Sequence, residues 1–109
     1  MAGQNTITVP LNAIGTGSSS GEQIYGGLYK YVVDAVFGSS SAVSVEIGVG
    51  SSWVGIEDIL GNTVTNTDTG AVEESWDIYL PAGLVRITVG TATVTSGNAY
   101  IAPIDVTIQ

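Results

Sequence analysis

Residues 28–37, with the sequence LYKYVVDAVF, decide the fold class of this chain. Apolar and aromatic residues occupy every second position, so one face of an extended strand carries Tyr29, Tyr31, Val33, Ala35 and Phe37. Residues 43–49, VSVEIGV, alternate in the same way. A repeat of two indicates half-buried β-strands, because the apolar positions of an amphipathic helix recur every three or four residues.

The alternation continues outward along the chain and predicts about eight strands with no significant helix. The turn at 80–83, LPAG, places a proline where its fixed φ suits a β-turn. Another turn is expected at 96–98, SGN, between two C-terminal strands, and an acidic loop at 68–74. A strand is expected over 53–60, with at most one helical turn within 55–60. Short strands at regular spacing are typical of all-β, antiparallel β-sandwiches, and we predict a jelly-roll-like one.

The N-terminal region is predicted to be a tethered arm or edge strand. Residues 1–14 alternate like a strand and contain Pro10, which confines a strand to a sheet edge because proline lacks the N–H donor. Residues 15–21, GTGSSSG, have the composition of a flexible linker, and residues 22–109 form the sandwich domain. Such an arm completes its own sandwich or crosses to a neighbour. We predict that it crosses, and that the contact is made by Ile7, Val9 and Leu11.

A second candidate contact is the other face of residues 28–37. Leu28, Val32 and Val36 lie on it beside Lys30 and Asp34, which makes the face more apolar than a free surface. Exposed apolar patches mark interaction sites in soluble proteins. We therefore predict a homo-oligomer, with a trimer favoured.

The composition excludes several kinds of chemistry. The 109 residues are enough for one domain, and 44% of them are hydrophobic, which indicates a folded chain rather than a disordered one. Histidine and cysteine are both absent from the sequence. Neither an imidazole-assisted nucleophile nor a thiolate metal site can be built without them. We predict that the protein is not an enzyme and uses no cofactor.

Carboxylate chemistry is not expected either. A glycosidase needs two carboxylates that face each other, whereas the neighbours in Glu57-Asp58 and Glu73-Glu74 would point to opposite faces of a strand. The oxygen-bearing residues around Asp68 do not match the spacing of a calcium loop. The sequence therefore predicts no metal site.

The charge of the chain opposes nucleic-acid and membrane partners. The net charge is −8, and Lys30 and Arg86 are the only cations, too few to neutralise a phosphate backbone or an anionic lipid surface. Residues 1–10 lack the basic region and apolar run of a secretory signal, and no apolar run has the length of a membrane-spanning helix. We expect synthesis in a cytoplasm.

The aromatic residues allow two interpretations. Exposed rings could stack on the apolar faces of sugars, as in carbohydrate-binding modules of the sandwich type. Three of the rings alternate in phase with aliphatic core positions and favour a core or a subunit interface, namely Tyr29, Tyr31 and Trp76. Trp53 follows a turn and fits either interpretation. The remaining rings considered for a platform are Tyr25, Tyr79 and Tyr100.

Residues 78–89, IYLPAGLVRITV, followed by GNAYI at 97–101, resemble the C-terminal part of small virion proteins of tailed bacteriophages. The resemblance implies a β-sandwich decoration or cement protein of the virion that forms trimers on the capsid. It also implies that the major capsid protein or another virion protein is the partner. The alternative is a carbohydrate-binding or adhesion module, such as a phage receptor-binding appendage, and a tail subunit is a third interpretation.

Overall fold

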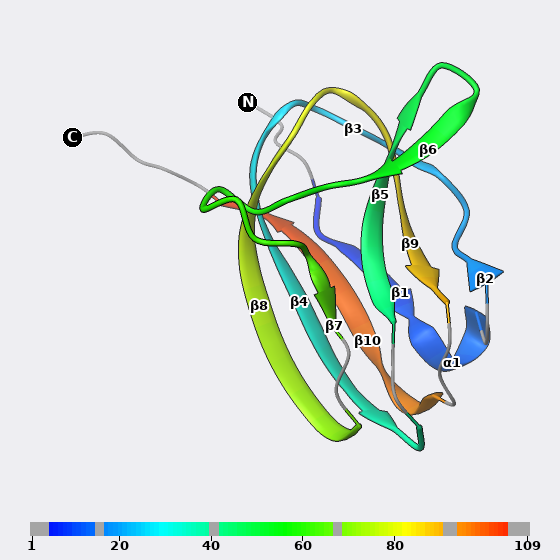
Figure 1. The fold of residues 1–109 in the computed structure, drawn as a ribbon. Helices are drawn as coiled ribbons and strands as arrows, with labels where there is room; N and C mark the ends of the chain where they lie inside the picture. Colours follow the sequence, from blue (N-terminus) through cyan, green and yellow to red (C-terminus); the bar gives the residue numbers. More distant parts are fainter. Residues whose placement is uncertain (1–4, 15–16, 40–41, 67–68, 91–93, 105–109) are drawn as a thin grey trace.

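The computed structural model describes residues 5–14, 17–39, 42–66, 69–90 and 94–104 as two antiparallel sheets packed face to face (Figure 1). Sheet A has the order β1-β10-β4-β8. Its strands are β1 (Ile7–Pro10), β10 (Val94–Pro103), β4 (Gly27–Phe37) and β8 (Gly70–Leu80). This confirms the predicted all-β, antiparallel sandwich.

Sheet B is built around β9 (Gly83–Val89) and β5 (Val43–Val49), which pair with each other. On the far side of β9 lie β2 (Gly17–Ser18) and β3 (Glu22–Ile24), which pair with different parts of that strand. On the far side of β5 lie β6 (Ser52–Gly55) and β7 (Thr65–Asn66), again one after the other. The ten described strands therefore fill eight positions in the two sheets.

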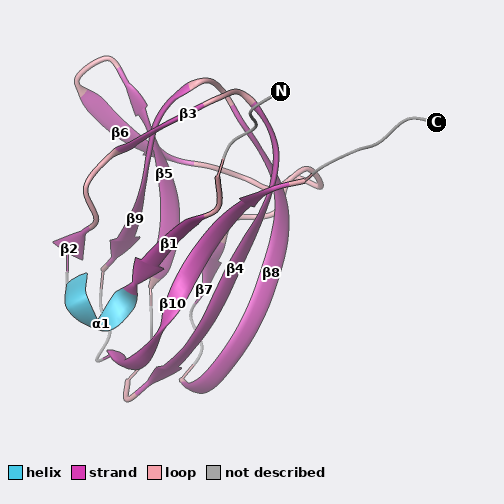
Figure 2. Ribbon diagram, turned by 180° about the vertical axis from the view of Figure 1, so that it is seen from behind, coloured by secondary structure: helices cyan, strands magenta, loops and turns pink. Residues whose placement is uncertain are grey.

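The strand order is that of a jelly roll. When the eight positions are numbered along the chain, positions 1, 8, 3 and 6 form sheet A, and positions 2, 7, 4 and 5 form sheet B. Two interlocked Greek keys give this order. The first and last described strands, β1 and β10, are neighbours in sheet A (Figure 2).

The core lies between the sheets and follows the period of two. All five alternating residues that the sequence analysis assigned to one face of 28–37 are buried on the inner face of β4. Tyr31 stacks on Trp76 of β8, with ring centroids 5.2 Å apart. The opposing side chains of sheet B come from β5 and β9, namely Val43, Val45, Val85, Ile87 and Val89.

Two segments lie side by side where they cross from one sheet to the other. β3 continues into β4 and pairs with β9, while β8 continues into β9 and pairs with β4. At the crossing, a Cβ atom on Gly26 would lie 3.1 Å from the backbone nitrogen of Ala82, so a side chain there would require the two segments to move slightly apart. The predicted LPAG turn at 80–83 is therefore a corner between sheets. We call the end of the sandwich formed by the loops at 25–26, 49–52, 56–64 and 81–82, together with the strand residues within two positions of them, the corner end (upper part of Figure 1).

The N-terminal strand is shorter than predicted. β1 ends at Pro10, and Leu11–Ile14 form one helical turn, α1, which is the only helix in the described part of the chain. Proline explains the change, since it cannot donate to a ladder but is tolerated at the start of a helix. The helical turn allowed within 55–60 is not formed, because β6 ends at Gly55 and a loop follows.

Two predicted connections are wrong because their residues belong to long strands. The turn at 96–98 lies inside β10, where an irregular register between Val94 and Ser96 and the left-handed φ of Gly97, +114°, keep the strand paired with β4. The acidic loop at 68–74 is mostly the start of β8, whose pairing with β4 runs from Gly70 to Leu80. In both cases, pairing along all of β4 outweighs local turn propensity.

Candidate interaction surfaces

The arm residues lie in the sandwich of their own chain. β1 pairs with β10 of the same sheet, and Val9 and Leu11 are 7% and 0% exposed, with Ile7 partly buried against the same core. This is the first of the two arrangements considered for the arm, not the crossing that we predicted. In this structure Leu11 offers no surface to a partner, and Val9 offers little. The linker is also partly ordered by pairing, because residues 17–18 form β2.

Leu28, Val32 and Val36 lie together on the outer face of sheet A, as the alternation of β4 requires. Leu28 and Val32 are half-buried, and Val36 is 39% exposed. Polar groups interrupt the strip, since Lys30 forms an ion pair with Asp77 across the β4–β8 pair. The outer face of sheet A is therefore mixed rather than a continuous apolar patch.

The same face carries two like charges directly opposite each other. Asp34 of β4 is the register partner of Glu73 of β8, and both side chains are exposed. Facing carboxylates destabilise a strand pair slightly. Nearby, Asn98 donates a hydrogen bond from Nδ2 to the Tyr100 hydroxyl at 3.1 Å.

The exposed large apolar side chains gather at the corner end. Leu60 is 81% exposed, Tyr25 65% and Tyr79 63%. Among the described residues, Val36 is the only exposed large hydrophobic side chain that lies elsewhere. The complete corner-end set is Tyr25, Val49, Val54, Ile59, Leu60, Tyr79 and Leu84. Exposed apolar groups concentrated in one region, unlike scattered ones, indicate an interaction site.

The most exposed of these residues is held in place by its own turn. The Asp58 carboxylate accepts hydrogen bonds from the backbone N–H groups of Leu60 and Asn62, at 2.9 and 2.8 Å. These hydrogen bonds lower the pKa of Asp58, and the bond from the Asn62 N–H has the largest effect. The Ile59 N–H donates to the Asp77 carbonyl of β8 at 3.0 Å and ties the loop to sheet A. Leu60 is thus presented to solvent by an ordered loop.

The sequence predicts a strand over 53–60 followed by a turn at Gly61-Asn62, whereas β6 ends at Gly55 and the loop begins there. A signal for the turn was present. Asp58 precedes Gly61-Asn62, and an aspartate that bonds the backbone N–H groups after it is a common turn starter. The apolar pair Ile59-Leu60 at the tip of such a turn has no core to enter, and is therefore exposed.

A separate polar and aromatic row crosses the outer face of sheet B. The Arg86 guanidinium carbon lies 4.3 Å from the ring centroid of Trp53. Arg86 donates from Nε to Glu46 Oε1 at 2.8 Å, and the Thr88 hydroxyl donates to the same oxygen at 2.7 Å. Burial alone would raise the pKa of Glu46, but the bonds from Thr88 and Arg86 outweigh it and lower that pKa.

Trp53 is half-buried because two glycines leave room for its ring. A Cβ atom on Gly21 would lie 3.1 Å from its Cη2 atom, and one on Gly48 would lie 3.8 Å from its Cζ3 atom. The ring thus lies over the outer face of sheet B, between β5 and the residue that precedes β3. The predicted core rings behave differently, with Tyr29 and Tyr31 buried and Trp76 partly buried against the core, whereas Tyr25 and Tyr79 are exposed.

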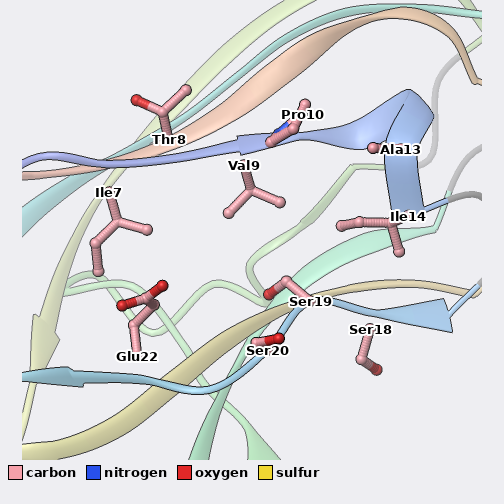
Figure 3. A pocket seen from close by; sticks show the side chains of 10 residues that line it. All are labelled: Ile7, Thr8, Val9, Pro10, Ala13, Ile14, Ser18, Ser19, Ser20 and Glu22. Carbon is pink, nitrogen blue, oxygen red and sulfur yellow. The ribbon is translucent and has the colours of Figure 1, made fainter.

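A groove of about 390 Å³ opens between the edges of the two sheets at β1 and β2–β3 (Figure 3). Ile7 and Val9 point from β1 toward Ser19 and Glu22 on the opposite side, and Ile14 of α1 closes one end. The complete lining is Ile7, Thr8, Val9, Pro10, Ala13, Ile14, Ser18, Ser19, Ser20 and Glu22. Glu22 is its only charged residue.

No cluster of three or more potential metal ligands occurs in the described ranges, and Asp68, the centre of the rejected calcium loop, lies outside them. None of the helices in the part of the chain that the structure describes is long and apolar enough to span a membrane. Comparison with protein-family models, curated proteins and solved structures gives no significant match. The function must therefore be inferred from the chain's own fold and surface.

Proposed function

We propose that this chain is a non-enzymatic structural protein of a bacteriophage virion, a decoration or cement subunit that acts through protein–protein contacts. The observation that carries the proposal is the gathering of exposed apolar side chains at the corner end, led by Leu60, Tyr25 and Tyr79. Such a surface gains free energy when another protein covers it, at roughly 25 cal/mol per Å² of apolar area.

The fold and the charge are consistent with this role. Jelly rolls form viral capsid domains and lectin domains, a fold-level analogy that admits the proposal without selecting it. Both cations of the sequence are held in ion pairs, Lys30 with Asp77 and Arg86 with Glu46. The remaining carboxylates give the surface its negative charge, so a capsid protein that binds it would offer basic or neutral residues. The proposed location is the virion, after synthesis in the host cytoplasm.

We place the contact between subunits at the corner end and propose a homotrimer, the assembly that the virion resemblance implies. Covering one exposed leucine contributes about 1.5–3 kcal/mol. The double variant Leu60→Ser/Tyr79→Ser should therefore weaken self-association by more than tenfold. The matched control Val36→Ser removes the one exposed large apolar side chain described outside this end, and should leave the assembly unchanged.

Light scattering after size-exclusion chromatography at micromolar concentration measures the assembly directly. The expected result is an oligomeric mass for the natural chain and for Val36→Ser, and a monomeric mass for the double variant. Co-sedimentation with capsids that lack this protein then tests the partner. A strictly monomeric mass together with no capsid binding would refute the proposal.

A second candidate function, a carbohydrate-binding or adhesion module, is favoured by the row on sheet B. Trp53 combines an aromatic ring with the hydrogen-bonding groups of Arg86, Glu46 and Thr88 on one solvent-facing sheet. This candidate predicts a monomer that binds glycans, with tryptophan fluorescence changing on titration. The response should disappear in Trp53→Ala, whereas the double variant at the corner end should retain it.

A further inference from the structure

The groove between β1 and β2–β3 lies where both sheets end. β1 pairs with β10 on one side only, and β2 and β3 pair with β9 on one side only, within the described chain. The two open edges face each other across the groove (Figure 3). Its floor is apolar, formed by Ile7, Val9 and Ile14, and its opposite wall carries hydroxyl groups and one carboxylate.

Backbone groups on the β2 side are available to a ligand. The Ser19 N–H donates to the Ile87 carbonyl of β9 at 2.8 Å, and the Ile87 N–H donates to the Ser19 hydroxyl at 2.9 Å. Since successive residues of an extended strand direct their amides to alternate sides, the backbone of Ser18 in β2 faces the open edge. An extended peptide can pair with such an edge.

The negative charge of the groove favours a ligand that carries a positive charge. The side chain of Glu22 is exposed and has no ion pair or hydrogen bond among the described residues. Lys30 and Arg86, the only cations of the sequence, are engaged by Asp77 and Glu46. A ligand that brings its own cation would therefore neutralise a carboxylate that this chain leaves unneutralised.

We propose that this groove binds an extended segment of a partner polypeptide that carries a lysine or arginine. Alternate apolar side chains of the segment lie against Ile7 and Ile14, its backbone pairs with the edge at Ser18, and its cation meets Glu22. The inference rests on the proposed role in protein binding and assigns it a second contact, separate from the corner end. The short edges offer few ladder bonds, so side-chain recognition must supply the specificity.

The probe is a fluorescent peptide of roughly eight residues, blocked at both ends, that alternates valine and threonine around one central lysine. The control peptide has glutamate in place of the lysine. Fluorescence anisotropy with the full chain should show binding of the lysine peptide and at least tenfold weaker binding of the glutamate control peptide. Ser20→Phe, which fills the groove from an exposed position, should abolish binding, whereas Ser51→Phe on the β5–β6 turn should not.

Glu22→Gln should weaken the lysine peptide about three- to fivefold, as expected for an exposed ion pair, and the loss should shrink at high salt. The control Glu57→Gln removes an exposed carboxylate outside the groove and should have no effect. Absence of binding at millimolar peptide, or equal binding by Ser20→Phe and Ser51→Phe, would overturn the proposal. Light scattering of Ser20→Phe separates the two proposals, because filling the groove leaves assembly through the corner end unchanged.

Discussion

Replacing Gly97 by alanine tests the path of β10 across sheet A. The glycine has φ +114°, and a Cβ atom there would lie 2.3 Å from Ala35 Cα, 2.4 Å from the Asp34 carbonyl oxygen and 2.6 Å from Ala35 Cβ. Two of these three atoms belong to the backbone of β4, which is paired on both sides and cannot turn away. The alanine therefore forces the two central strands apart or moves the irregular register in β10.

The cost has two parts. Forcing extra volume into a packed region costs about 1–3 kcal/mol, and a left-handed conformation costs an alanine about 1–2 kcal/mol. Together they predict a loss of about 2–5 kcal/mol, a large share of the 5–15 kcal/mol that stabilises an ordinary domain. At about 4–8 °C for each kcal/mol in a domain near this size, the melting temperature should fall by at least about 8 °C.

Urea unfolding followed by tryptophan fluorescence measures the loss as a lower midpoint, and calorimetry gives the melting temperature. The matched control is Gly55→Ala in β6, where an added Cβ meets no atom within 4 Å and φ is not left-handed. It should change stability by less than about 1 kcal/mol. If Gly97→Ala unfolds at the same urea concentration as the natural chain, the close approach of β10 to β4 is wrong.

Three further predictions concern side chains and ions. The pKa of Glu46 is lower in the folded chain than in the unfolded chain, so ionised Glu46 stabilises the fold above the unfolded pKa and this stabilisation is lost as the pH falls. Between about pH 6 and about pH 3, the natural chain should therefore lose more of its free energy of unfolding than Glu46→Gln, as measured by urea titration. Trp53→Ala should cost about 1–3 kcal/mol in urea unfolding, from lost burial and the contact with Arg86, and an unchanged midpoint would mean that the ring stabilises nothing. Neither a chelator nor millimolar calcium should move the melting temperature in a thermal scan, whereas a rise of several degrees with calcium would reveal a site.

The sequence predicted the features that depend on local alternation. The faces of residues 28–37 and 43–49, and through them the core, follow from the period of two, because the inner face of each strand must be apolar. The strand limits could not be predicted in the same way. From the local sequence alone, Gly97 predicts a turn and the acidic start of β8 predicts a loop. Both segments are strands in the structure because they pair with the full length of β4.

The candidate surfaces were less predictable because they are assembled from distant parts of the chain. Tyr25, Leu60 and Tyr79 share one end only because the two corners and the 56–64 loop meet there (Figure 1). The groove likewise needs the edges of both sheets. No short stretch of the sequence contains all the residues of the corner end or of the groove. The burial of Val9 and Leu11 in their own core depends on β10, almost the whole chain length away.

The pairing of β1 with β10 has a consequence for how the molecule is made. Ile7 pairs with Ile101, so the first strand has no partner until the roughly ninety residues that follow it have been synthesised. At about 5–20 residues per second, β1 waits for several seconds with its apolar residues exposed. Strand pairings between distant residues also form slowly. Sheet A therefore closes late, and the nascent chain passes through a period in which Ile7, Val9 and Leu11 are exposed to other polypeptides before they enter the core.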